Sequence, residues 1–286
     1  MTNAGATPLD LRGPIGLGTW RVGSSNRQRA DESAAVLHAL QIGYRLLDTA
    51  EMYADGGAER VIGAALAQYG VHRRGELTIV SKVLPSNASA TGTVRACEAS
   101  LKRMGCEYLD LYLLHWAGRY PYTETLRGFE QLLQRGLIRH FGVSNLDLHE
   151  LQQWIADERR VGLTASGVQC NQLYYAASAR GIEFDLLPWQ REHRIQTMAY
   201  SPLGEGRLAE HPVLTAIGER HGVSAAQVAL AWCIRHPGVV AIPKSVRRDR
   251  LEENLRAAQL QLTSEDLAQI DHAFPPPRAK RPLEMI

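Results

Sequence analysis

Four polar residues follow three short apolar runs in this chain of 286 residues. They are Asp48 and Tyr53 after residues 44–47, Lys82 after residues 77–81, and His115 after residues 109–114. A carboxylate, a phenol, an ammonium and an imidazole can together polarise a carbonyl group and deliver a proton to its oxygen. Because each group stands where a strand would pass into a loop, the sequence predicts that all four share one pocket.

The chemistry of these groups points to proton delivery. A phenol is a poor acid at neutral pH because its ordinary pKa is about 10. The ammonium of Lys82 can stabilise the phenolate of Tyr53, and Asp48 can hold that ammonium in place. His115 can orient a carbonyl oxygen by hydrogen bonding. The proton transfer needs an incoming hydride, which no side chain carries, so a reduced nicotinamide is the expected source.

Eight apolar runs alternate with amphipathic helical segments along the chain. The expected strands are residues 15–20, 44–49, 77–82, 109–115, 138–145, 167–172, 195–201 and 239–244. The expected helices are residues 30–41, 57–68, 90–104, 123–135, 147–156 and 183–192, one stretch within 211–235, and a last helix at 247–258. Continuously apolar strands are typical of a parallel sheet that is covered on both faces.

Eight such units favour a closed (β/α)8 barrel of the TIM type over an open sheet. Residues 9–12, with Gly13-Pro14 and the run that follows, are expected to form a short hairpin that caps the barrel bottom. No linker divides the chain, so residues 1–286 are predicted to form a single domain. A barrel carries its active site at the carboxyl ends of its strands, where the four polar groups fall.

Composition excludes several classes of partner. The net charge is +2, which gives no global field toward nucleic acid or a membrane surface. The four cysteines lack metal-ligand spacing and are expected to be reduced thiols, and no metal site is predicted. The chain shows neither a signal peptide nor an apolar run of about 20 residues. We therefore expect a cytoplasmic protein. The four polar groups add the expectation of a small carbonyl compound as its partner, and a monomer is expected.

The cofactor site is expected away from the first strand, where the sequence has no G-x-G-x-x-G motif. The segments 201–204 and 244–245 open loops on the same barrel face and can hold phosphates. The basic stretch from Lys244 to Arg250 can offer an ammonium, a hydroxyl and a guanidinium to an additional phosphate. NADPH is therefore favoured over NADH, with Arg247 and Arg248 expected to face solvent.

Seven segments, in this order, resemble the aldo-keto reductase family over nearly the whole chain. They are GLGTW at 16–20, DTAEMY at 48–53, VSK at 80–82, LDLYLLHW at 109–116, GVSN at 142–145, AYSPLG at 199–204 and IPKS at 242–245. Each segment alone is a modest signal, but the ordered set is specific. The resemblance implies a (β/α)8 barrel, NADPH-dependent carbonyl reduction, and a tetrad formed by Asp48, Tyr53, Lys82 and His115.

The resemblance also implies roles for further residues. Those expected to bind the cofactor are Ser144, Asn145 and Gln169 at the nicotinamide carboxamide, Tyr200 stacked on its ring, Ser201 and Leu203 at the pyrophosphate, Lys244, Ser245 and Arg250 at the 2′-phosphate, and Glu253 and Asn254 near the adenine. Trp20 and Trp116 are expected to line the substrate pocket with Tyr53 and His115, although both tryptophans can instead pack the barrel.

The segment 181–189 and the short tail resemble a bacterial branch of the family whose members reduce small reactive aldehydes such as methylglyoxal. Animal aldose reductases carry a long closing loop, whereas this chain ends soon after Phe274, so a more open pocket is expected. Two alternatives remain. One is an NADPH-binding regulatory barrel that resembles the β subunits of potassium channels. The other is an NADP-dependent polyol or sugar dehydrogenase.

Overall fold

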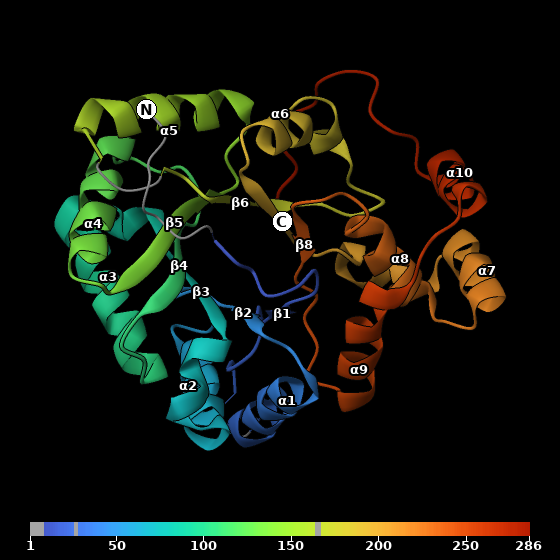
Figure 1. Cartoon of the computed structure of the whole chain (residues 1–286), viewed down its shortest axis with the longest axis horizontal. Coiled ribbons are helices and arrows are strands. Elements are labelled where there is room, and N and C mark those ends of the chain that lie inside the picture. Colours follow the sequence, from blue (N-terminus) through green and yellow to red (C-terminus); the bar gives the residue numbers. More distant parts are fainter. Residues whose placement is uncertain (1–8, 26–27, 164–166) are drawn as a thin grey trace.

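The computed structural model describes residues 9–25, 28–163 and 167–286. Eight parallel strands form one sheet in the order β1 to β8, and helices surround the sheet (Figure 1). The strands are β1 (Leu17–Gly18), β2 (Leu46–Asp48), β3 (Thr78–Val83), β4 (Leu109–Leu114), β5 (Ile138–Ser144), β6 (Cys170–Tyr174), β7 (Gln196–Tyr200) and β8 (Val239–Ala241).

The sheet closes where the segment around β1 meets β8. The backbone N–H of Gly16 donates to the carbonyl oxygen of Ala241 at 2.9 Å, and the N–H of Gly18 donates to Pro243 at 3.1 Å. Gly18 has no room for a side chain, because a Cβ there would lie 2.6 Å from the carbonyl oxygen of Ile242. These bonds confirm the predicted (β/α)8 barrel.

The helices follow the expected alternation, with two differences. The α-helices are α1 (Arg29–Ile42), α2 (Gly57–Tyr69), α3 (Ala90–Met104), α4 (Tyr122–Gln134), α5 (Leu148–Val161), α6 (Leu186–Glu192), α7 (Pro212–His221), α8 (Ala225–Cys233), α9 (Arg248–Arg256) and α10 (Ser264–Ala273). The stretch within 211–235 holds two helices, because Gly222 ends α7 in a left-handed conformation. An additional helix, α10, was not predicted and packs beside α7 outside the helical ring (Figure 1).

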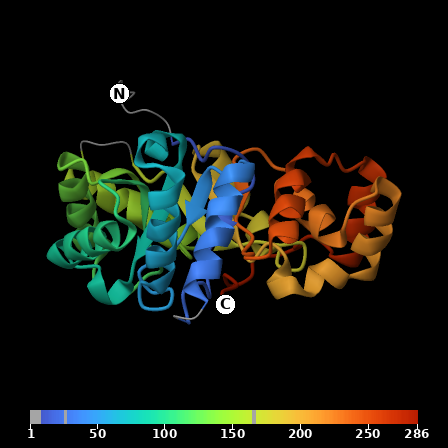
Figure 2. The same ribbon diagram turned by 90° about the horizontal axis from the view of Figure 1, so that it is seen from below.

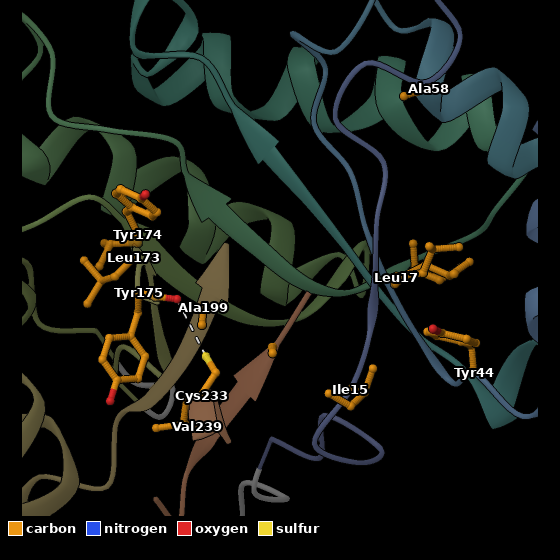
Figure 3. Close-up of a cluster of buried hydrophobic side chains, with 14 of the residues drawn as sticks. Ile15, Leu17, Tyr44, Ala58, Leu173, Tyr174, Tyr175, Ala199, Cys233 and Val239 are labelled. Atoms are coloured by element: carbon orange, nitrogen blue, oxygen red, sulfur yellow. Dashed lines mark hydrogen bonds between the residues drawn. The ribbon is translucent and has the colours of Figure 1, made fainter. Parts of the chain in front are cut away.

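The core has two layers because successive strand residues face opposite sides. Inside the barrel, one cluster includes Leu46, Val80 and Leu111. Outside it, a larger cluster fills the space between the strands and the helices. Figure 3 shows part of this outer layer, where the Cys233 thiol lies 3.6 Å from the carbonyl oxygen of Tyr175. The inner layer supports the carboxyl ends of the strands from below.

The expected hairpin at the barrel bottom is wrong. Residues 9–14 contain no strand, and among the described residues the next run pairs only in parallel, between Ile15 and Ala241 and between β1 and its neighbours. Leu9 and Leu11 nevertheless close this end, because both are buried in the inner cluster. The hydroxyl of Thr78 holds the segment by donating to the carbonyl oxygen of Asp10 at 2.8 Å. Two leucines therefore plug the barrel without a second strand.

The C-terminal segment turns back toward the barrel. After α10 it passes α6 and ends near the barrel centre (Figure 1), on the lower face of the molecule in Figure 2. Arg180 fixes its start by donating to the carbonyl oxygen of Phe274 at 2.6 Å and to Asp271 at 2.7 Å. Lys280 forms an ion pair with Asp185 at 3.3 Å. In the described part of the chain, no helix is both long enough and apolar enough to cross a membrane.

Candidate active site

The alternation of the strands points three of the four predicted groups into the barrel. Asp48 follows the inward-facing Leu46 by two residues, and Lys82 follows the inward-facing Val80 in the same way. His115 comes directly after β4 and has the same parity as Leu113. Tyr53 lies in the loop between β2 and α2 and reaches back over Lys82, with the Lys82 ammonium 4.8 Å from the centre of its ring. The structure therefore brings all four together.

Lys82 is fully buried, and each of its donors has a partner. Its Nζ lies 2.9 Å from both carboxylate oxygens of Asp48, 2.8 Å from the carbonyl oxygen of Thr49 and 3.2 Å from the hydroxyl of Tyr53. An ammonium can only donate, so the Tyr53 oxygen accepts this hydrogen bond. The hydroxyl proton of Tyr53 is then free to point toward another acceptor.

Burial and charge act against each other on these groups. Burial raises the pKa of Asp48, while the charge of Lys82 and hydrogen bonds from Lys82 and Gln172 act to lower it. Burial also raises the pKa of Tyr53, and Lys82 acts in the opposite direction. For Lys82, burial would lower the pKa, but attraction to Asp48 and Tyr53 raises it overall. The ammonium therefore keeps its proton and stays available to stabilise a negative charge on the phenol oxygen.

His115 is neutral at physiological pH. Burial, with a smaller effect from Lys82, lowers the pKa of His115 to about 2. Its ring lies edge-on to the Tyr53 ring, with centroids 5.8 Å apart, and its Nδ1 has no hydrogen-bond partner among the described residues. Trp116 packs against the same imidazole at 4.7 Å between centroids. A neutral imidazole at this position can donate one hydrogen bond beside the phenol.

A cavity of about 320 Å³ opens above these groups. Asp48, Tyr53 and His115 line it, while Lys82 lies beneath its floor. The other residues that line it are Gly18, Trp20, Met52, Trp116, Ser144, Asn145, Gln172, Tyr200, Ser201, Ile242, Lys244, Met285 and Ile286. Trp20 and Trp116 therefore both line the pocket, which is the position predicted for them.

Ser144, Asn145 and Tyr200 form a connected polar wall of the cavity. The Tyr200 hydroxyl donates to the Asn145 side-chain oxygen at 2.8 Å, and the Asn145 amide donates to Ser144 Oγ at 3.0 Å and to the carbonyl oxygen of His115 at 3.1 Å. Asn145 and Ser201 both have a left-handed backbone, with φ of 57° and 47°. This conformation is uncommon outside glycine, and here it turns the chain at the ends of β5 and β7.

The placement of Gln169 in the pocket is wrong. β6 begins at Cys170, later than expected, so Gln169 lies at the opposite end of the strand and its amide donates to the carbonyl oxygen of Gly167. Gln172 occupies the cavity instead, because it faces inward with Cys170 and lies near the carboxyl end of β6. Its amide donates to Asp48 at 2.7 Å. Gln172 was not predicted, but its parity, counted back from the Tyr174-Tyr175 end of the run, could have identified it.

The remaining predicted residues lie outside the cavity, with the exception of Lys244. Leu203 packs against the outer core. Ser245 Oγ accepts from the backbone N–H of Arg247 at 3.1 Å, just before α9. The other three lie along α9, with Arg250 exposed, Glu253 half-buried and Asn254 buried. All three lie on the outside of the barrel, because α9 is part of the helical ring (Figure 1).

The short tail, from which a more open pocket is expected, reaches the cavity. Met285 and Ile286 line the cavity, so the C-terminal segment supplies part of its wall. Trp20, Met52, Met285 and Ile286 are among the exposed large apolar side chains of the chain, and they gather at this one opening. The cavity therefore has an apolar rim above a charged and hydrogen-bonded floor.

Fold and cavity together describe a barrel enzyme that can donate a proton to a carbonyl oxygen. The family model for the aldo/keto reductase family matches residues 14–274. The chain is 44% identical to the methylglyoxal reductase YeaE of Escherichia coli over 95% of this chain and 94% of that protein. It is 37% identical to the glyoxal reductase of Bacillus subtilis, over 90% and 87% of the two chains.

Solved structures agree with this similarity. An aldo-keto reductase from Klebsiella pneumoniae in complex with NADPH has a TM-score of 0.88 and 42% identity, covering 96% of this chain and 95% of that one. A second structure from the same species, with NADP and acetate, has a TM-score of 0.89 and 40% identity, covering 98% and 100%. This chain belongs to the aldo/keto reductase family.

Proposed function

We propose that this protein reduces small aldehydes and ketones to alcohols with NADPH, and that methylglyoxal is the best candidate substrate. The observation that carries the proposal is the hydrogen bond from Lys82 to Tyr53 at 3.2 Å, inside a cavity and beside the neutral His115. The likeness to a methylglyoxal reductase and a glyoxal reductase supports this class of substrate.

In the proposed reaction Tyr53 is the general acid. Lys82 donates to the phenol oxygen and so stabilises the phenolate that remains after proton transfer. Asp48 holds the ammonium with both carboxylate oxygens. His115, as a neutral donor, orients the carbonyl oxygen toward the phenol. Bound NADPH would supply the hydride to the carbonyl carbon.

The residues present fit a nicotinamide. The ring of Tyr200 offers a stacking surface, and the polar side chains of Ser144, Asn145 and Gln172 lie on the same wall of the cavity. We assign the carboxamide to these three and withdraw Gln169 from the set. Ser201 lines the cavity next to Tyr200 and remains the candidate for the pyrophosphate, together with the backbone at Leu203.

The preference for NADPH over NADH rests on the residues at and beyond the end of β8. Lys244 and Arg250 are exposed, and no carboxylate of the described chain lies within ion-pair distance of either. A phosphate can therefore bind them without displacing a partner. Ser245 stands between them at the start of the loop, and Glu253 and Asn254 on α9 remain the candidates for the adenine.

The apolar rim is the proposed substrate wall. Trp20, Met52 and Trp116 lie around the opening above Tyr53 and His115. Such a wall favours a small carbonyl compound that carries an apolar group, because burial of apolar surface stabilises the complex.

The direct test follows NADPH consumption with methylglyoxal, phenylglyoxal, short aldehydes and aldoses. We expect Tyr53→Phe to lower kcat by about 100-fold or more, the usual contribution of a general acid, with little change in NADPH affinity. Tyr122→Phe is the matched control, since Tyr122 lies on α4 outside the cavity. Normal turnover by Tyr53→Phe would exclude the assignment.

The same measurements separate the alternatives. Tight NADPH binding without turnover across the panel would favour a regulatory barrel. Faster oxidation of polyols with NADP⁺ than reduction of aldehydes would favour a dehydrogenase. Equal use of NADH, or an Arg250→Ala variant that binds NADPH as tightly as the wild type, would remove the assignment of the 2′-phosphate to Lys244, Ser245 and Arg250.

A further inference from the structure

The loop that carries Tyr53 has an unusual backbone. Three consecutive residues after Tyr53, Ala54, Asp55 and Gly56, have left-handed φ angles of 51°, 50° and 72°. For the alanine and the aspartate this conformation is unfavourable, so contacts elsewhere must hold the loop in place. A loop under such constraint will drift if its anchor is removed.

Glu51, two residues before Tyr53, provides an anchor of this kind. Its Oε1 accepts a hydrogen bond from the backbone N–H of Leu84 at 2.7 Å and another from the side-chain amide of Asn87 at 3.0 Å. Leu84 follows directly after β3, the strand that carries Lys82. One carboxylate oxygen therefore connects the loop of the phenol to the strand end of the ammonium.

The receiving segment is itself fixed. Leu84 leads into a short 3-10 helix, Pro85–Asn87, and this helix packs against the loop after β4. At Gly118 in that loop a Cβ would lie 2.4 Å from the Cβ of Pro85, so the two segments are in close contact. The loop after β4 begins with His115 and Trp116. Glu51 thus connects the loop of Tyr53 to a segment that follows β3, which carries Lys82, and contacts the loop after β4, which begins with His115.

Glu51 takes no direct part in the chemistry. It does not line the cavity, and neither of its hydrogen bonds goes to a side chain of the tetrad. Both partners are donors, so an amide oxygen at the same position can replace the carboxylate oxygen. A glutamine should therefore keep the anchor, whereas an alanine should lose it.

We infer that Glu51 is a positioning residue that holds the Tyr53 phenol at hydrogen-bond distance from Lys82 through the segment 84–87. The inference rests on the proposed role of Tyr53 as general acid. A displacement of about 1 Å at a reacting group can cost about 100-fold in rate. Loss of the anchor should therefore appear in kcat, while the cofactor wall at β5 to β7 is unaffected.

The experiment compares Glu51→Ala, Glu51→Gln and Asn87→Ala in the full chain. We expect Glu51→Ala to lower kcat for methylglyoxal about 10- to 100-fold, with NADPH affinity within about twofold of wild type. Glu51→Gln should restore most of the rate, and Asn87→Ala, which removes one of two hydrogen bonds, should fall between them. If Glu51→Ala does not fold, the glutamine and Asn87 variants still report on the anchor.

Glu124→Ala is the matched control. Glu124 also connects two elements, because it accepts from the N–H of Ala90 at 3.2 Å and from Arg127 at 2.8 Å, but it lies on α4 away from the cavity. We expect its loss to leave kcat unchanged. A kcat for Glu51→Ala within twofold of wild type, or equal losses in both variants, would overturn the inference.

Amide hydrogen exchange gives a second readout that needs no turnover. In Glu51→Ala, the peptide of residues 49–57 should exchange faster than in wild type and in Glu51→Gln. In Glu124→Ala the change should appear near residue 90 instead. If the wild type reduced none of the carbonyl compounds tested, the proposed function would fail, while exchange would still decide whether Glu51 holds the loop. Unchanged exchange in residues 49–57 would overturn the inference.

Discussion

The three donors of the Lys82 ammonium explain the different roles proposed for the members of the tetrad. One is directed to Asp48, one to the carbonyl oxygen of Thr49 and one to Tyr53. A charged donor that is fully buried, as Lys82 is, stabilises a phenolate strongly. Because the pKa of Lys82 is raised, its proton stays in place, and the proposed proton donor to the cavity is the Tyr53 hydroxyl. In the proposed reaction His115 would contribute a hydrogen bond and no charge.

The pH dependence of the reduction follows from these pKa directions. Tyr53 must be protonated to act as an acid, and burial raises its pKa above the ordinary value of about 10. Activity should therefore be present at neutral pH and lost only as pH rises through the alkaline range. His115, with a pKa of about 2, does not titrate near neutrality. We expect kcat/KM to stay flat between about pH 6.5 and 9.

The measurement is the pH profile of methylglyoxal reduction at saturating NADPH. A His115→Asn variant should be slower but keep the same shape, because the wild-type imidazole does not change charge in this range. A step centred near pH 6.5 that disappears in His115→Asn would show that the imidazole titrates as an ordinary histidine, and would contradict the neutral donor.

A second prediction compares the effects on NADPH binding of two glutamines, one in β6 and one directly before it. Gln172 faces the cavity, whereas Gln169 lies at the other end of the strand. Loss of one hydrogen bond to an amide costs about 0.5–1.5 kcal/mol. Gln172→Ala should therefore weaken NADPH binding by about 2- to 12-fold, and Gln169→Ala should leave it unchanged. Titration of cofactor fluorescence measures both, and equal effects would disprove the new assignment.

The tetrad could be predicted from sequence because its members follow well-defined apolar runs. Each run shows where its strand ends and which of its residues face the inside of the barrel. The run before Gln172 begins with Gly167 and Val168, which extended the expected strand at the wrong end. A shift of three residues changes both the facing side and the height in the barrel. Tyr53 also depends on a loop whose left-handed backbone at Ala54 and Asp55 no periodicity indicates.

Elements at the barrel bottom show a different limit of sequence reasoning. Leu9 and Leu11 alternate as strand residues would, yet they are held by the inner core and by Thr78 and not by a partner strand. Conversely, the N-terminus of α10 is marked in the sequence by a capping motif. Thr263 accepts from the N–H of Asp266, and Asp266 accepts from the N–H of Thr263, which forms a capping box. The apolar plug was predictable, but its conformation depended on tertiary contacts.

Removal of the plug should lower stability and leave catalysis intact. Leu11 is 3% exposed within the inner cluster, and a buried Leu→Ala change typically costs about 2–5 kcal/mol. We expect Leu11→Ala to lose free energy of unfolding in that range, measured by urea denaturation, with kcat unchanged at 25 °C. Val71→Ala is the control, since Val71 is 79% exposed and should change stability little. A loss of kcat without a loss of stability would show that the bottom of the barrel is coupled to the site.

Across the whole molecule, the C-terminal segment connects the outer helices to the cavity. It leaves α10 beside Arg180, crosses near Asp185 and brings Met285 and Ile286 to the opening (Figure 1). Only the complete fold creates this wall, because its residues are far in sequence from the loops they face. The rim therefore combines a loop after β1, a loop after β2, a loop after β4 and the last residues of the chain.

Substrate contact at this rim can be tested through Met285. If its thioether covers the apolar part of a bound aldehyde, Met285→Ala should lower kcat/KM for phenylglyoxal about three- to tenfold, because burial of roughly 30–55 Å² of apolar surface stabilises a complex by about 0.7–1.4 kcal/mol. The effect should be smaller for methylglyoxal, which has less apolar surface to cover, and NADPH affinity should not change. Glu284→Ala is the matched control, since Glu284 lies on the same segment but does not line this cavity. Equal losses for both aldehydes, or for both variants, would show that the segment supports the barrel without touching the substrate.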